Sequence, residues 1–173
     1  MNEKINKIVE YAVENKLITN EKNFKRLVSK SFSLIKDSVK EKGEELADLH
    51  FKVMSFTKDF PACFNGVNRS ELYKNAAEVL YFMFNELSIE VEKEECFIFF
   101  HFRELGKFRM KEDKVFEELK SEWAIHRDYE MPKADYEYAL RQLKNHGLIG
   151  LRRGAITLTD TTVFRFKLID DWE

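Results

Sequence analysis

The side chains that most often carry chemistry are few in this sequence and widely spaced. Its four histidines and two cysteines are His50, His101, His126, His146, Cys63 and Cys96. Cys96 and His101 are five residues apart, on different sides of a helix, and no CxxC pair offers a zinc site. No nucleophile-elbow motif and no glycine-rich phosphate loop is present. We therefore expect no catalytic residue, metal site or cofactor. We also expect the cysteines to be buried free thiols and the histidines to lie at the surface or the edge of the core.

Positive charge could bind nucleic acid, but in this sequence it is concentrated only in local clusters. The net charge is −2, and residues 1–91 hold 14 Lys and Arg against 14 Asp and Glu. Residues 92–173 hold 15 Lys and Arg against 17 Asp and Glu, so neither half is basic. Nucleic-acid binders concentrate positive charge because phosphate neutralisation supplies much of their affinity. Any such surface must therefore be a local cluster, and the segment from Met131 to Lys167 contains one.

Composition limits the scaffold that can position such a cluster. Hydrophobic residues make up 44% of the 173 residues and 16 of them are Phe, so a real core can form. With 6 Gly and 2 Pro, helices should dominate and loops should be short. No apolar stretch approaches the roughly 18 residues of a membrane span, and the charged N-terminus lacks a signal-peptide pattern. We expect a cytoplasmic protein without membrane contact.

The first half of the chain shows mostly helical periodicity. Apolar residues recur at helical spacing over 2–16, over 21–42 and again from 46 to 54, so one long helix or two are predicted after Glu21. Thr57 to Val67 is predicted to be a loop whose phenylalanines, Phe60 and Phe64, fold back onto the core. Asn68, with Glu71 three residues later, is predicted to cap a strongly apolar helix that ends near Leu87.

The second half predicts a longer series of elements. A helix is expected over 92–106, closed by Gly106, followed by a short strand over 108–110 and an amphipathic helix over 111–124. After a turn over 126–132, a helix runs to His146-Gly147 and a strand opens at Leu148-Ile149. A basic turn, Arg152-Arg153-Gly154, precedes a second strand that begins at Ala155 and extends to Lys167.

The most specific part of this series is Leu140-x-x-Leu143-x-x-x-Gly147-Leu148-Ile149, followed by the basic turn and Ile156-x-Leu158-Thr159. It resembles the transition from recognition helix to wing in the winged-helix (winged helix-turn-helix) superfamily, over roughly residues 92–168. No single family is identified. The resemblance implies a mainly α fold with a small β-hairpin, in which a helical bundle domain (1–90) packs against a winged-helix domain (91–173).

The resemblance also implies a function and a set of contacts. The recognition helix would be about 133–146 and the wing about 149–167. The residues that would contact double-stranded DNA are Lys133, Tyr138, Arg141, Lys144, Asn145, Arg152 and Arg153. Arg141 and Lys144 would contact phosphates or guanine edges, and Asn145 an adenine or a phosphate. Arg152 and Arg153 would reach the backbone or an adjacent minor groove. The protein would then be a DNA-binding factor in transcription regulation, acting as a homodimer through the helices at 21–42 and 69–87.

Two observations keep alternatives open. Asp135 and Glu137 lie on or near the proposed reading face, where they would repel phosphate. Winged-helix folds also serve as protein–protein adaptors, for which a near-neutral charge is no obstacle. A third possibility is a small α+β domain whose hairpin is purely structural.

Overall fold

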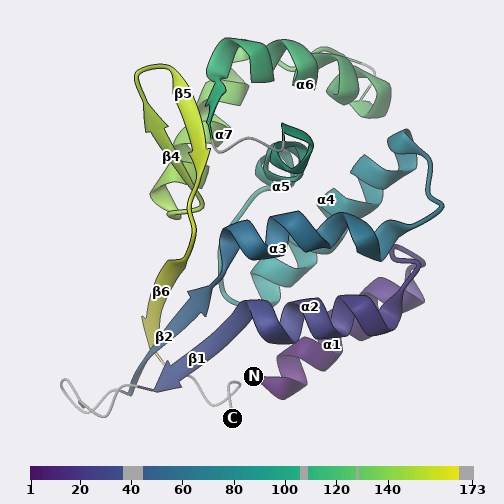
Figure 1. Cartoon of the computed structure of the whole chain (residues 1–173), viewed down its shortest axis with the longest axis vertical. Coiled ribbons are helices and arrows are strands. Elements are labelled where there is room, and N and C mark those ends of the chain that lie inside the picture. The colour runs from purple at the N-terminus through teal and green to yellow at the C-terminus, as the bar shows by residue number, and fades with distance from the viewer. Residues whose placement is uncertain (37–44, 106–108, 128, 168–173) are drawn as a thin grey trace.

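The computed structural model describes residues 1–36, 45–105, 109–127 and 129–167, and within these ranges the chain is mainly α-helical (Figure 1). The helices are α1 (Asn2–Glu14), α2 (Glu21–Ser31), α3 (Val53–Asp59), α4 (Arg69–Glu86), α5 (Lys93–His101), α6 (Glu112–Arg127) and α7 (Lys133–Asn145), with 3-10 turns η1 (Phe60–Phe64) and η2 (Phe102–Leu105). The strands are β1 (Phe32–Lys36), β2 (Leu46–Phe51), β3 (Met110–Lys111), β4 (Ile149–Arg152), β5 (Ala155–Leu158) and β6 (Thr162–Lys167).

Helix starts in the N-terminal part follow local side-chain chemistry. The Asn20 side chain accepts a hydrogen bond from the backbone N–H of Asn23 at 3.0 Å, and α2 begins after it. The Asn68 side chain accepts from the backbone N–H of Glu71 at 2.9 Å, which confirms the predicted cap of α4. Each cap satisfies a backbone donor that the first helical turn would leave without a partner.

The long helix predicted from residue 21 is wrong beyond Ser31. Phe32–Lys36 is a strand, paired antiparallel with β2, and residues 37–42 of the predicted helix lie outside the described residues. In β2 the burial alternates, and Ala47, Leu49 and Phe51 are fully buried. The apolar spacing that suggested a helix from 46 to 54 therefore conceals a period of two, the period of a strand buried on one face.

The loop predicted over 57–67 is largely helical. Residues 57–59 close α3, and η1 follows, with Pro61 in its first turn, where a missing N–H costs nothing. Phe60 and Phe64 are 2% and 3% exposed, so their predicted return to the core is confirmed. Further along, η2 follows α5, and the predicted closing residue Gly106 lies outside the described residues, as does Phe108 of the predicted short strand.

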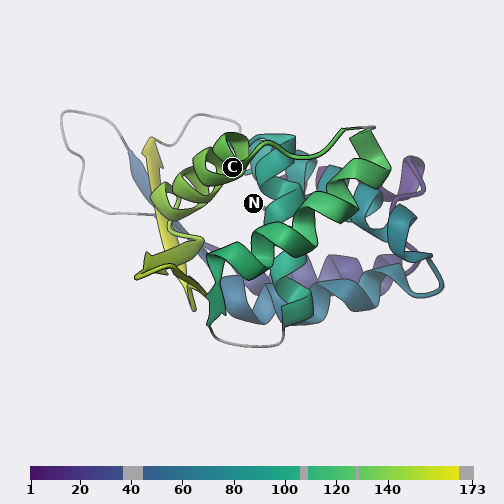
Figure 2. The ribbon, with the colours of Figure 1, turned by 90° about the horizontal axis from the view of Figure 1, so that it is seen from above.

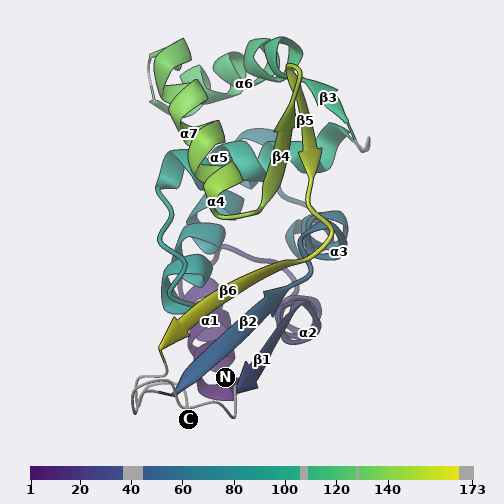
Figure 3. The same cartoon turned by 90° about the vertical axis from the view of Figure 1, so that its left-hand side faces the viewer.

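A strand from the end of the chain completes the N-terminal sheet. β6 pairs antiparallel with β2, giving the order β1-β2-β6, so the N-terminal part is not purely a helical bundle (Figure 3). The run from Ala155 to Lys167, predicted to be one strand, is two: β5 stays in the hairpin, and β6 leaves it. β6 thereby crosses from the predicted C-terminal domain into the predicted N-terminal one.

One continuous core joins the two parts, as expected for parts that are packed rather than tethered. It contains residues from Ile5 in α1 to Ile156 in β5. The broad apolar surface of α4 lies inside this core, where α1, α5 and α6 cover it. That breadth therefore no longer indicates a dimer interface. Among the described residues, no helix combines the length and apolar character that crossing a membrane requires.

Candidate nucleic-acid interface

The C-terminal elements form a compact unit around a three-stranded sheet. Its chain order is α5, β3, α6, α7, β4 and β5, and its strand order is β3-β5-β4. β4 pairs antiparallel with β5 through Ile149 opposite Leu158, and β3 pairs with β5 through Met110 opposite Ile156. Seen from above, α6 crosses over α5, with α7 to one side (Figure 2). The β4–β5 hairpin lies beside α7 (Figure 3).

The end of α7 has the local structure that the sequence predicts. Leu140 and Leu143 are buried, and Leu148 and Ile149 enter the core directly after the helix. Gly147 has a φ of +75°, and the N–H of Leu148 donates to the carbonyl of Leu143 at 3.0 Å. This is the left-handed helix ending that favours glycine. It turns the chain from α7 into β4 with three residues between the two elements.

The hairpin turn is equally well defined. Arg153 and Gly154 both have positive φ, 52° and 70°, as a type I′ turn requires. The N–H of Glu112 donates to the carbonyl of Gly154 at 2.9 Å, which joins the turn to the start of α6. Arg152 and Arg153 are exposed at this turn.

All seven predicted contact residues are exposed, but they do not form one surface. Lys133, Arg141 and Lys144 share one side of α7, because they are eight, three and eleven residues apart, spacings that return to the same side of a helix. Tyr138 lies on another side and borders two cavities that are lined partly by glutamates from the start of α5 and the residues before it. Asn145 lies at the C-terminal end of α7, and the two arginines of the turn form a separate cationic group.

Two more cations join the hairpin arginines, and the sequence analysis did not identify them. Lys111 in β3 pairs with Ala155, the residue that also faces Arg152 across the hairpin. Arg109 directly precedes β3, and both side chains are exposed. Residues 109–111 come next to the hairpin turn because β3 pairs with β5 in the order β3-β5-β4. The positive charges of Arg109 and Lys111 are visible in the sequence, but the local sequence does not show that they lie near the hairpin.

Acidic residues interrupt the cationic side of α7. Glu137 is four residues from both Lys133 and Arg141 and therefore lies between them on the exposed face. Lys133 is 4.0 Å from the carboxylate of Asp113 at the start of α6. Asp135 lines a cavity together with Glu92 and Glu94. One flank of α7 is therefore acidic, and the cationic strip is narrow.

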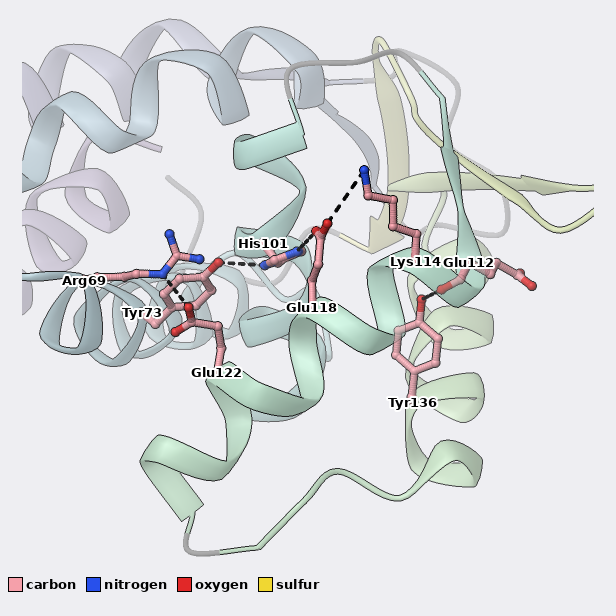
Figure 4. A network of polar contacts seen from close by, with 8 residues as sticks. All are labelled: Arg69, Tyr73, His101, Glu112, Lys114, Glu118, Glu122 and Tyr136. Atoms are coloured by element: carbon pink, nitrogen blue, oxygen red, sulfur yellow. Dashed lines mark hydrogen bonds and ion pairs between the residues drawn. The ribbon is translucent and has the colours of Figure 1, made fainter.

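A polar network holds α4, α5 and α6 together (Figure 4). The Tyr73 hydroxyl lies 2.6 Å from Nδ1 of His101, and Nε2 of His101 lies 3.2 Å from Glu118. Arg69 of α4 forms an ion pair with Glu122 of α6. Tyr73 and His101 are 0% and 1% exposed, which makes the network a support for the helices and not a place where a substrate can bind. His101 thus lies in the core, deeper than the core-edge position expected.

A second contact fixes α7 against α6. The Tyr136 hydroxyl donates to the backbone carbonyl of Glu112 at 3.0 Å, and the ring is almost fully buried (Figure 4). Burial raises the pKa of Tyr136, with further contributions from the carboxylates of Glu112 and Asp113. The side chain therefore stays a neutral donor, and it sets the orientation from which α7 presents its exposed face.

The two cysteines are buried and free, as predicted. Burial raises the pKa of the Cys63 thiol to about 12, and it raises the pKa of Cys96 well above the ordinary value. Thiols held protonated in this way are poor nucleophiles and poor metal ligands.

The exposed side of α7, the hairpin turn and residues 109–111 are therefore the candidate interface, with Glu137 in the middle of its helical part. No family model, no curated protein and no solved structure matches this chain.

Proposed function

We propose that this chain is a winged-helix protein that binds double-stranded DNA, with α7 as the recognition helix and the β4–β5 hairpin as the wing. The observation that carries the proposal is the strand order β3-β5-β4 within the series helix, strand, helix, helix, strand, strand. Beside this sheet, the β4–β5 hairpin contacts α7, and the outer side of α7 and the turn at Arg152-Arg153 are both exposed. A role in transcription regulation belongs to the same proposal.

Each group of residues has a part in this proposal. Lys133, Arg141 and Lys144 contact phosphates or guanine edges from the exposed side of α7. Arg152 and Arg153, joined by Lys111, contact the backbone beside the groove that α7 enters. Residues 109–114 and 133–158 together hold eight Lys and Arg against four Asp and Glu, whereas the whole chain has a net charge of −2. Positive charge is therefore concentrated in this part of the chain.

A protein–protein adaptor is the second candidate, and a specific observation favours it. Glu137 lies between Lys133 and Arg141, and Asp135 belongs to an acidic cavity with Glu92 and Glu94. A protein partner with mixed charges tolerates such a surface, whereas a phosphate backbone is repelled by its acidic members. In this case the same helix and hairpin form the interface.

Duplex binding as a function of salt separates the two candidates. We expect affinity to fall steeply as salt rises, and Arg141→Ala and Arg152→Ala each to reduce the slope of log K against log salt by roughly one. Lys22→Ala and Lys25→Ala in α2 are the matched controls: they remove two exposed cations from another part of the chain and should leave the slope unchanged. Absence of duplex binding at low salt would refute DNA binding and leave the adaptor.

A homodimer remains part of the proposal. The apolar helices that first suggested a dimer interface no longer support it. Operators with two-fold symmetry are commonly bound by two-fold symmetric proteins. The helix predicted over 21–42 is shorter, and α4 is covered within one chain. Light scattering at the concentrations used for duplex binding tests this directly, and a monomer that binds duplex at one-to-one stoichiometry would remove the dimer from the proposal.

A further inference from the structure

Two cavities of about 200 and 510 Å³ adjoin along α7, on a different side of the helix from its cationic residues. Glu92, Glu95 and Tyr138 line both cavities, so the two form one groove between α7 and residues 90–95, which lead into α5. None of the described residues that line this groove is a lysine or an arginine. We call it the acidic groove, because its lining holds five carboxylates, those of Glu90, Glu92, Glu94, Glu95 and Asp135.

Glu95 is a buried carboxylate without a counter-charge at the centre of this groove. The residue is only 3% exposed, yet it lines both cavities. Its Oε2 accepts a hydrogen bond from the backbone N–H of Glu92 at 3.1 Å. Within the described residues, its Oε1 accepts no hydrogen bond and no cation pairs with either oxygen. Because buried charges in proteins are nearly always paired, Glu95 is a carboxylate that a bound cation would complete.

The other groups of the groove do not neutralise it. Glu94 lies 4.0 Å from Arg127, a loose and half-exposed ion pair. Burial lowers the pKa of His146 at the far end, opposed by its hydrogen bond to the backbone of Glu90 and by the charge of that residue, so the ring is neutral at neutral pH. In the part of the chain that the structure describes, three exposed carboxylates have no ion pair, those of Glu90, Glu92 and Asp135.

The carboxylates are spread along the groove and do not converge on one point. Across the described ranges, no three carboxylate, histidine or cysteine side chains lie close enough together to hold a metal ion. On α7 the groove extends from Asp135 to His146, about 17 Å at a rise of roughly 1.5 Å per residue. An extended chain covers this length with about five residues. The groove therefore matches a short segment with several cations better than a single ion.

Two exposed tyrosines lie among the carboxylates. Tyr129 and Tyr138 are 52% and 53% exposed, and both line the groove. The face of an aromatic ring attracts a cation, and the aliphatic stem of a lysine or arginine packs against it. Tyrosine is also enriched among the residues that contribute most to protein–protein binding. This combination favours lysine and arginine side chains over inorganic cations.

From these observations we propose that the acidic groove binds an extended segment of a partner protein that carries several lysine or arginine side chains. One cation lies at Glu95, where the two cavities meet, and others lie toward Asp135 and Glu90. Their stems pack on Tyr129 and Tyr138. The proposal does not depend on DNA binding, because the lysines and arginines of the candidate interface do not line the groove.

Short peptides test this binding directly. The probe is a capped peptide of about six residues in which arginine and glycine alternate, long enough to span the groove. Its citrulline counterpart has the same shape without the charge, and spermidine has several charges without a peptide backbone. Titrations at physiological ionic strength are followed in ¹⁵N–¹H correlation spectra through the backbone amides of Asp135, Tyr138 and Gln142. We expect the arginine peptide to shift these signals saturably, and citrulline peptide and spermidine to bind more weakly by roughly ten-fold or more.

Matched variants locate the charge that matters. Glu95→Gln keeps an acceptor for the N–H of Glu92 but removes the buried charge, and it should weaken binding by roughly ten-fold or more. Asp135→Asn and Glu90→Gln should each weaken it by roughly two- to five-fold, the range of an exposed charge contact. Glu137→Gln removes a carboxylate from α7 outside the groove and should leave the affinity unchanged. Unchanged far-ultraviolet circular dichroism spectra are the check on folding, and the two exposed variants suffice if Glu95→Gln does not fold.

Three results would overturn the proposal. The first is an arginine peptide that does not move the amide signals of the groove saturably. The second is a citrulline peptide or spermidine that binds as tightly as the arginine peptide, because charge or the extended segment would then contribute nothing. The third is an affinity that Asp135→Asn and Glu137→Gln lower equally, because the carboxylates would then act through the net charge of the protein and not within the groove.

Discussion

Substitution of Gly147 should destabilise the fold for two separate reasons. A Cβ atom at this position would lie 2.5 Å from Oγ1 of Thr162, and the residue has a φ of +75°. An alanine at this position therefore has two separate energetic costs. The left-handed conformation costs a non-glycine residue about 1–2 kcal/mol. The overlap with Thr162 adds about 1–3 kcal/mol, the usual cost of overpacking. We expect Gly147→Ala to lower the free energy of unfolding by about 2–5 kcal/mol, the sum of the two costs.

Gly154 provides the matched control. It has a similar φ of +70°, but no atom of the described residues lies within 4 Å of a Cβ built there. Gly154→Ala should therefore lose only the conformational part, about 1–2 kcal/mol. Urea unfolding at neutral pH, followed by circular dichroism, measures both variants, and the difference between them isolates the contact with Thr162.

Thr162→Ala completes a double-mutant cycle. Alone it removes a long hydrogen bond from Oγ1 to the carbonyl of His146, 3.4 Å, and should cost about 0.5–1 kcal/mol. Combined with Gly147→Ala it also removes the clash, so the double variant should be more stable than additivity predicts by about 1 kcal/mol or more. If Gly147→Ala costs no more than Gly154→Ala, or if the two changes are additive, the reasoning from Thr162 is refuted.

Three further outcomes follow. The unfolded chain releases the Cys63 proton near the ordinary thiol pKa of about 8.5, whereas burial raises that pKa to about 12 in the folded chain. The free energy of unfolding should therefore fall as pH rises from about 8.5 toward 12. Urea titrations at several pH values should show a smaller fall in Cys63→Ala, and an unchanged fall would contradict this assignment. Tyr73→Phe removes the buried hydrogen bond to His101 and should lower the free energy of unfolding by about 1–3 kcal/mol; a value near zero in the same assay would mean that the network does not support the helices. Glu137→Gln should raise duplex affinity by roughly two- to five-fold at low salt, and the exposed Glu10→Gln in α1 should not; equal effects would show that Glu137 does not face the duplex.

Local patterns predicted the elements that local chemistry determines. The cap at Asn68 and the glycine ending of α7 depend on residues within five positions, so their sequence signatures were sufficient. The burial of Leu140 and Leu143 followed from helical spacing in the same way. Exposure of the five predicted contact residues on α7 is the complement of that spacing.

Strands β1 and β2 could not be predicted by the same means. One of the two partners of β2 is β6, more than a hundred residues away, with Leu49 opposite Phe164. Phe32 and Ile35 fit a helical stripe as well as a strand, and in the structure Phe32 is buried whereas Ile35 is 54% exposed on β1. Long-range pairing selected the strand over the helix.

The pairing of β6 with β2 also connects the candidate interface to the N-terminal sheet. Arg165 donates to both carboxylate oxygens of Asp48, at 2.8 and 3.1 Å, and this bond holds the pKa of Asp48 below its ordinary value. A shift of one residue would separate this pair and turn Phe164 and Phe166 away from the inner face, so the register is strongly specified. The hairpin therefore continues into a strand fixed in the N-terminal sheet, and α7 is joined to the hairpin through Gly147. Together with the continuous core, this packs α7 and the helices α1 to α4 around the same buried residues. A partner that binds the exposed side of α7 therefore binds an element that is packed into one core with the N-terminal part.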